Sequence, residues 1–426
     1  MGFNLGTVAI LWPALDLGTC SVWVSYMVIT SFIEVGRTGL LQNGLMAYLN
    51  ITPMSEHAKI NASSLFLNLS LSVVFVIMLL LGREQAAHFL HDRRIATLLG
   101  IYAATTFLLS GLYQFNFIQQ ANLDFKGLFW SSFVKNGLLF FYVLYVKLTK
   151  GAFDLSHLAI CQLVAALPAT LVAYSFAKRY FRIALKPDWA WVKKLFDYGK
   201  YTFGTNIATM TYKNVDKIML QHLLLGSLST YELSIKINNL AEVPSMTLSA
   251  ILFPQSARRN DTEGGNSAKY LYEKGVGVLL AIILPLVVGI IIFADIIIFF
   301  IGGEKYANSA PLLRMTIFYG VFMAYAVQFG TILDSIGKPK LNFYITTLGA
   351  FINLGLNYYF IKTYGLYGAV AGSLIAMSIM FIIMQVILRK LLKVNTLNAF
   401  TYMLDFYKMI YKKVKNRFLK VEIVNQ

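Results

Sequence analysis

Charged side chains recur at helical spacing inside segments that are otherwise apolar enough to lie in a membrane. In TMTYKNVDKIMLQ, residues 209–221, the charges are Lys213, Asp216 and Lys217. A charge at the centre of a bilayer costs about 2.5–3.5 kcal/mol, so such residues are expected to face a protein interior or a wet cavity. Lysines in that position predict a site for an anionic group, and phosphate or diphosphate is the natural candidate.

The same segment carries further polar side chains on one face. They follow one another at steps of three or four residues: Thr202, Asn206, Thr209, Lys213 and Asp216. This spacing aligns them along one side of a helix. We therefore expect a polar stripe that faces a cavity.

Similar charges stand in other apolar segments. Five basic residues are expected to line a substrate-binding cavity: Arg37, Lys135, Lys213, Lys217 and Lys236. Three acidic residues are expected to pair with these charges or to bind a coupling ion: Glu34, Asp216 and Glu242. For Glu34 with Arg37, and for Asp216 with Lys213, a purely structural role in helix packing stays an equal alternative.

The sequence shows no catalytic signature. It contains no Walker A sequence, no GxSxG, no HExxH and no acidic cluster with metal-ligand spacing, and Cys20 and Cys161 lack metal-ligand spacing as well. We expect no catalytic residue, no metal and no cofactor. Without an ATP-binding segment, any energy input would come from an H⁺ or Na⁺ gradient, a partner, or consumption of the product.

Composition is typical of an integral membrane protein. Of the 426 residues, 57% are hydrophobic and only 13% are charged, whereas about a quarter of a soluble protein is charged. The run GVLLAIILPLVVGIIIFADIIIFFIG, residues 277–302, is long enough to cross about 30 Å of hydrocarbon. Because the apolar runs are continuous and not alternating, they predict a helical bundle.

Twelve helical segments would position the charges. We expect them at residues 2–14, 20–42, 61–82, 95–118, 127–146, 156–177, 199–221, 230–254, 276–301, 309–334, 342–361 and 364–388. The fold class is therefore an all-α polytopic membrane protein with about twelve transmembrane helices. The first segment is shorter than the seventh, which favours a truncated first helix over a short oblique one.

The loops and an internal similarity predict the organisation of the chain. Two six-helix lobes, 1–177 and 199–388, are joined by a basic amphipathic linker, 178–198, and followed by a basic tail, 389–426. Two similar halves with a substrate site between them are a recurring plan of transporters.

Most of the net charge of +17 follows from topology. With both termini in the cytoplasm, 23 of the 37 Lys and Arg residues fall in inner segments and 7 in outer loops. This bias predicts that both termini lie in the cytoplasm and explains the charge without nucleic acid as a partner.

Two longer stretches resemble a known family. YKNVDKIMLQHLLLGSLSTYELSIKINNLAEVPSMTLSAILFPQSAR, 212–258, has an Asn-x-Asp-Lys helix, a Leu-Gly turn, a Tyr-starting helix and a terminal Phe-Pro. DSIGKPKLNFYITTLGAFINLGLNYYFIKTYGLYGAVAGSLIA, 334–376, has a Gly-Lys-Pro loop, an Asn-rich helix and Gly-x-x-Gly-Ala. Together they resemble the polysaccharide transporters of the MOP exporter superfamily, which are related to MATE transporters.

The resemblance implies a V-shaped bundle working by alternating access, and no enzymatic activity. It implies a flippase that carries an undecaprenyl-diphosphate-linked oligosaccharide from the cytoplasmic to the periplasmic leaflet for O-antigen, capsule or exopolysaccharide biosynthesis. A polysaccharide polymerase and chain-length machinery are further partners to expect. The resemblance also implies that Arg37, Lys213, Asp216, Lys217 and Lys236 line the cavity.

Three alternatives remain. A MATE-type drug antiporter would need a mainly acidic cavity, whereas the charges here lean basic. A lipid II flippase usually carries two additional helices. A membrane-embedded polysaccharide polymerase would typically show a large outer loop, and the longest outer loop expected here has only about a dozen residues.

Overall fold

The computed structural model describes residues 2–122, 124–182, 184, 186–263 and 265–424. This part of the chain is helical, with a single short 3₁₀ turn, η1 (Glu304–Tyr306), and no strand. The expected all-α class is therefore confirmed. The helices group into two compact units, Met1–Ser229 with Phe300–Lys305, and Thr230–Phe299 with Tyr306–Gln426.

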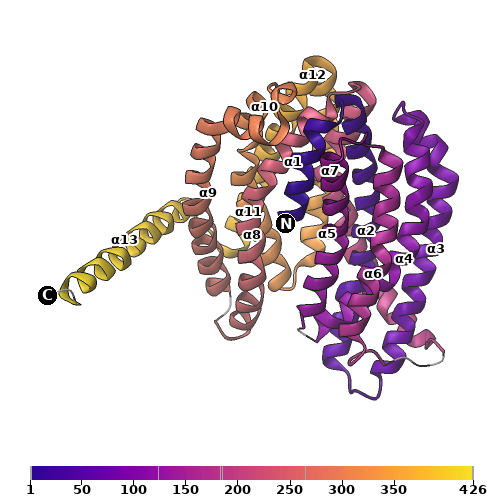
Figure 1. Ribbon diagram of the computed structural model, residues 1–426. Helices are drawn as coiled ribbons and strands as arrows, with labels where there is room; N and C mark the ends of the chain where they lie inside the picture. The colour runs from indigo at the N-terminus through magenta and orange to yellow at the C-terminus, as the bar shows by residue number, and fades with distance from the viewer. Residues whose placement is uncertain (1, 123, 183, 185, 264, 425–426) are drawn as a thin grey trace. The chain divides into compact units, whose positions relative to one another are not determined.

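The first unit is a bundle of helices that run roughly side by side (Figure 1). It consists of α1 (Gly2–Ala14), α2 (Leu17–Ile51), α3 (His57–Phe89), α4 (Arg94–Ala121), α5 (Lys126–Leu148), α6 (Leu155–Ala177) and α7 (Trp189–Leu223). The sequence grouped residues 199–221 with the later helices. In the structure α7 belongs to the same compact unit as α1–α6.

The second unit holds nearly all of α8 and the helices that follow. Their bounds are α8 (Leu228–Glu263), α9 (Gly265–Gly302), α10 (Ser309–Thr316), α11 (Tyr319–Ser335), α12 (Pro339–Leu392) and α13 (Asn398–Val424). Its core brings together apolar side chains of α9, α11 and α12, including Tyr272, Phe329 and Leu388.

Aspartates begin three helices of the first unit. Asp16, Asp154 and Asp188 precede α2, α6 and α7, and each carboxylate accepts a hydrogen bond from a backbone N–H of the first turn, at 2.7–2.9 Å. Such a cap satisfies a donor that has no partner within the helix. The caps fix where the site-bearing helices α2 and α7 begin.

Eight segments of the described chain are long and apolar enough to cross a membrane: Leu17–Met46, His57–Phe89, Arg94–Ala121, Lys126–Leu148, Leu155–Ala177, Ser267–Gly302, Ser309–Ser335 and Lys340–Leu392. The 54 residues of α12 suffice for two crossings, since a non-helical Gly365 (φ 61°, ψ −135°) divides it. With α1 and the more polar α7 and α8, these helices correspond to the twelve expected segments.

The last part of the region expected to be an amphipathic linker is helical. From Trp189 onward it forms the beginning of α7, continuous with the segment that bears Lys213. Trp191 is buried, and its Nε1–H donates to Glu56 at 3.0 Å. This contact ties the start of α7 to the start of α3. Trp189, in contrast, remains exposed.

A close crossing joins α2 to α7. A Cβ on Gly199 would overlap the carbonyl oxygen of Leu40, and one on Gly39 would lie 2.8 Å from Asn206 Nδ2 and 3.0 Å from Phe203 Cα. Small residues at such a crossing let helix backbones approach, as they commonly do in membranes. The crossing holds the polar face of α7 against α2.

Candidate functional site

The charged residues of α2 lie inside the first unit, where α4 holds them. Glu34 accepts hydrogen bonds from two tyrosines of α4. Tyr102 Oη lies 3.2 Å from Oε1, and Tyr113 Oη lies 2.6 Å from Oε2. Tyr102 Oη also lies 3.4 Å from the carbonyl oxygen of Thr30, one turn earlier on α2. The carboxylate is thus fixed in position by α4.

Arg37, one turn after Glu34, is 1% exposed. Its Nη2 donates to Ser72 Oγ of α3 at 3.1 Å, and to the carbonyl oxygen and Oγ1 of Thr106 of α4 at 2.8 and 2.9 Å. The guanidinium carbon lies 5.5 Å from the centre of the Tyr113 ring, a cation–π distance. Arg37 was expected to line a cavity. The structure places it in the seam between α2, α3 and α4.

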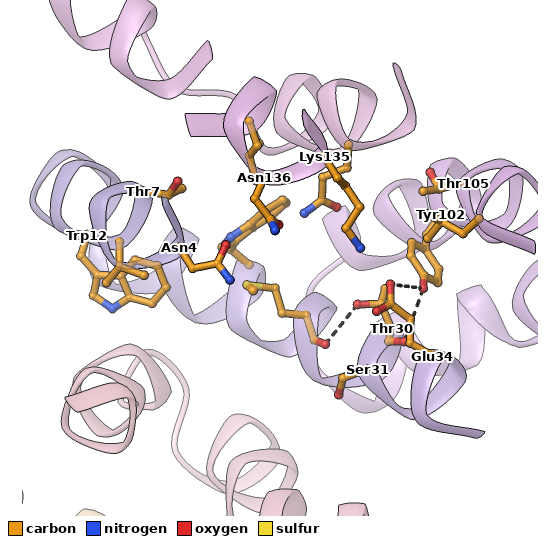
Figure 2. A pocket seen from close by; sticks show the side chains of 16 residues that line it. Asn4, Thr7, Trp12, Thr30, Ser31, Glu34, Tyr102, Thr105, Lys135 and Asn136 are labelled. Carbon is orange, nitrogen blue, oxygen red and sulfur yellow. Dashed lines mark hydrogen bonds between the residues drawn. The ribbon is translucent and has the colours of Figure 1, made fainter. Parts of the chain in front are cut away.

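A cavity of about 250 Å³ lies beside Glu34 within the first unit (Figure 2). Its lining comes from α1, α2, α4, α5 and α6: Asn4, Thr7, Val8, Trp12, Trp23, Met27, Thr30, Ser31, Glu34, Tyr102, Thr105, Leu109, Lys135, Asn136, Leu139 and Gln162. The volume is slightly below the ~300–1,000 Å³ of pockets that enclose a drug-sized ligand. The cavity therefore suits one small polar group and not a whole oligosaccharide.

Lys135 and Asn136 of α5 face Glu34 across this cavity. Figure 2 shows the Lys135 side chain extending toward Glu34 and Tyr102, with Asn136 and Asn4 turned toward the same space. The cavity thus combines an ammonium group, a carboxylate and several amides within the first unit. Both charges were predicted as site residues, and the structure brings them to one cavity.

The charges of α7 are also largely enclosed. Asp216 and Lys217 are 5% and 8% exposed, and Lys213 is half-buried. Asp216 Oδ1 accepts a hydrogen bond from the backbone N–H of Lys217 at 2.8 Å. Asn206, earlier in the predicted polar stripe, lies against Gly39 of α2. At that position, the stripe therefore faces a neighbouring helix.

In the second unit, α8 carries the remaining predicted residues. Lys236 Nζ lies 3.7 Å from Glu232 Oε1, one turn away on the same helix. Glu242 is half-buried. These residues belong to a different compact unit from Glu34 and Lys135.

Sequence reasoning did not identify the tyrosines that hold Glu34. Tyr102, Thr106 and Tyr113 stand four and seven residues apart, which places them on one face of α4. This polar face in an apolar segment was the available signal. Among the described residues, no group of three or more His, Cys, Asp or Glu side chains is arranged to hold a metal ion.

The comparisons with known proteins relate most of the chain to polysaccharide biosynthesis. A family model described as "Polysaccharide biosynthesis protein" matches residues 22–311. The lipopolysaccharide biosynthesis protein WzxC of Escherichia coli is 23% identical over 348 residues, 79% of this chain and 67% of WzxC. The probable low-salt glycan biosynthesis flippase Agl15 of Haloferax volcanii is 21% identical over 195 residues, 46% of this chain and 41% of Agl15.

A further relative, the uncharacterized membrane protein MJ1068 of Methanocaldococcus jannaschii, is 27% identical over 209 residues, 49% of this chain. The chain spans 41% of the length of MJ1068 and of Agl15.

Solved structures share the fold. The lipid II flippase MurJ in an inward closed conformation superposes with a TM-score of 0.77 at 15% identity, covering 96% of this chain and 89% of MurJ. An inward-facing multidrug resistance MATE family transporter of the MOP superfamily superposes with a TM-score of 0.77 at 17% identity. The match covers 92% of this chain and 95% of that transporter. At these identities the likeness shows the fold alone. The fold is that of the MATE and MurJ transporters, which are not enzymes.

Proposed function

Because this chain belongs to the polysaccharide biosynthesis protein family, we propose that it is a flippase for a lipid-linked oligosaccharide. The substrate is an undecaprenyl-diphosphate-linked repeat unit, carried from the cytoplasmic to the periplasmic leaflet of a bacterial inner membrane. Transport proceeds by alternating access. The product serves the assembly of a surface polysaccharide, and both termini lie in the cytoplasm.

The chemistry of the substrate explains why a protein is needed. A sugar-diphosphate head group carries many hydroxyls and about two negative charges, and moving such groups into hydrocarbon without partners is prohibitive. A polar, enclosed path replaces the lost hydration. The lipid tail stays in the membrane.

The observation that supports this proposal best is the set of charges enclosed in apolar helices. Lys217 is 8% exposed on α7, and Lys135 faces an internal cavity with Glu34. Lysine ammonium groups bind phosphate as point charges. In the proposed mechanism, Lys213 and Lys217 of α7 contact the diphosphate, while Asp216 balances part of their charge.

The cavity beside Glu34 has a separate role in the proposal. Its amides and hydroxyls offer donors and acceptors of the kind that sugar hydroxyls also present, and Lys135 and Glu34 contribute opposite charges to its lining. Arg37 does not contact the substrate in this proposal. It holds α2 to α3 and α4 through Ser72 and Thr106. The transport energy comes from an H⁺ or Na⁺ gradient or from consumption of the product by a polymerase and its chain-length partner.

Genetic complementation tests the proposed function. The gene is expressed in a bacterial strain that lacks its own polysaccharide flippase, and surface polysaccharide is measured together with lipid-linked precursor. Restored polysaccharide and a falling precursor pool support the flippase. A chain that restores none but lowers the accumulation of a cationic dye would act as a drug antiporter, which refutes the proposal.

A further inference from the structure

The last helix, α13, is fixed to α9 by a defined joint. After α12 ends at Leu392, Lys393 adopts a left-handed conformation with φ of 53°. Glu273 of α9 is 2% exposed. Its two oxygens accept hydrogen bonds from the backbone N–H of Asn395 at 2.7 Å and from Asn398 Nδ2 at 2.8 Å. The chain therefore enters α13 in a set direction.

The first turns of α13 then lie directly against α9. A Cβ on Gly277 would lie 2.6 Å from the carbonyl oxygen of Ala399 and 2.7 Å from Tyr402 Cβ, so only glycine fits there. Tyr407 Oη donates to the carbonyl oxygen of Ala281 at 2.7 Å. The contacts on α9, at residues 273, 277 and 281, are one turn apart. They hold α13 along one face of α9.

This joint lies where α9 changes from polar to apolar. Lys269, Glu273 and Lys274 lie in its polar part, and the apolar run that begins at Gly277 has no charged residue before Asp295. In a membrane-spanning helix such a change marks the boundary between head groups and hydrocarbon. Figure 1 shows α13 leaving α9 and extending away from it. The helix therefore leaves α9 at the level of the membrane interface.

Alongside and beyond these contacts with α9, α13 presents two different exposed stripes. An apolar stripe follows steps of four, three and four residues: Phe400 (44% exposed), Leu404 (53%), Tyr407 (38%) and Tyr411 (68%). A basic stripe follows steps of four and three on the adjacent face: Lys408, Lys412 and Lys415, all exposed. Adjacent apolar and lysine-rich faces are typical of helices that lie in the membrane interface.

We propose that α13 lies in the plane of the membrane and binds anionic phospholipid head groups. The apolar stripe enters the acyl boundary, and the lysines contact lipid phosphates. A basic segment beside a membrane is attracted by anionic lipid and released by salt. This role is independent of the transported substrate.

The experiment uses the full chain reconstituted in vesicles. Both native cysteines are replaced (Cys20→Ala, Cys161→Ala), and Tyr411→Cys carries an environment-sensitive NBD label. In vesicles of phosphatidylcholine with phosphatidylglycerol, the label emits at shorter wavelength and resists quenching by acrylamide. In phosphatidylcholine alone, or at high salt, emission moves back toward the value in water.

Two charge variants decide the interpretation. The triple variant Lys408→Gln, Lys412→Gln, Lys415→Gln loses the dependence on phosphatidylglycerol, whereas the matched control Lys338→Gln, Lys340→Gln, also exposed, keeps it. Equal label accessibility in both lipids, or a lipid dependence that survives in the triple variant, overturns the proposal. The label's protection from acrylamide could instead rise with the density of protein in the vesicles, whichever lipid is used. That result would mean that a second copy of the chain covers α13, and it would overturn the proposal as well.

Discussion

The phenol of Tyr113 links the two charges of α2. Its hydroxyl donates to Glu34 at 2.6 Å, while its ring lies 5.5 Å from the guanidinium carbon of Arg37. A carboxylate and a guanidinium one turn apart are thus held by one side chain of α4. This arrangement keeps Glu34 at the cavity while Arg37 stays in the helix seam.

The variant Tyr113→Phe should destabilise the first unit without leaving a cavity in its core. The ring remains, but Glu34 loses its shorter hydrogen bond, and a hydrogen bond to a charged group contributes about 1.5–3 kcal/mol. The melting temperature of purified protein in detergent checks this. Tyr145→Phe, at an exposed position, should leave it unchanged. A Tyr113→Phe protein that melts with the wild type would show that the bond contributes no stability.

Arg37 and Lys135 should respond differently to replacement by alanine. Arg37→Ala removes three buried hydrogen bonds between α2, α3 and α4, so a loss of about 2–4 kcal/mol and poor expression are expected. Lys135→Ala should fold normally but lose transport, because its ammonium group faces the cavity. Thermal melts and complementation of surface polysaccharide measure the two effects. A stable but inactive Arg37→Ala protein would place Arg37 in the transport path.

The crossing of α2 and α7 should not tolerate a methyl group. In Gly199→Ala, the new Cβ meets the Leu40 carbonyl, and such overpacking costs roughly 1–3 kcal/mol. Gly289→Ala on α9 is the matched control, because no neighbouring atom lies within 4 Å of its Cβ. That control should be neutral or stabilising by up to about 1 kcal/mol. Equal melting temperatures for the two variants would contradict the close crossing.

The pair formed by Asp124, in the loop after α4, and Arg179 should make the stability of the protein depend on pH. A hydrogen bond from Arg179 holds the pKa of Asp124 below its usual range. Because the pKa is lower in the folded state, this pair stabilises the protein above the ordinary carboxyl pKa of about 4, and the contribution is lost as pH falls through the depressed value. Arg179→Gln should melt below the wild type at pH 7, and the gap should narrow in acid. A gap independent of pH would exclude this origin.

Hydropathy predicted the membrane-embedded middle of most helices but not their ends. The segment expected at 276–301 is the apolar part of α9, which begins at Gly265. Its polar first turns carry no hydropathy signal, although they hold Glu273 and the joint with α13. The segment expected at 309–334 corresponds to the span Ser309–Ser335. Within it, α10 and α11 are separated only by Ile317 and Phe318, which both have right-handed helical dihedral angles.

Part of the site was predictable from hydropathy as well. Glu34 and Lys135 stand out because charges are costly in apolar segments, and both line one cavity. Tyr102 and Tyr113 were not identified, because tyrosine is common in membrane helices and only the fold brings them to Glu34. The burial of Arg37 against Ser72 likewise depends on how α2 meets α3. Spacing within one helix does not reveal such contacts.

Transport of a lipid-linked oligosaccharide by purified protein tests the central claim most directly. The protein is reconstituted in vesicles with a fluorescent undecaprenyl-diphosphate oligosaccharide, and movement between leaflets is followed with a membrane-impermeant quencher. The wild type should exchange the lipid between leaflets, and Lys213→Ala with Lys217→Ala should reduce the rate to that of empty vesicles while the protein remains folded. Wild-type protein no faster than empty vesicles, or a folded double variant as fast as the wild type, would contradict the proposed flippase and its lysine site.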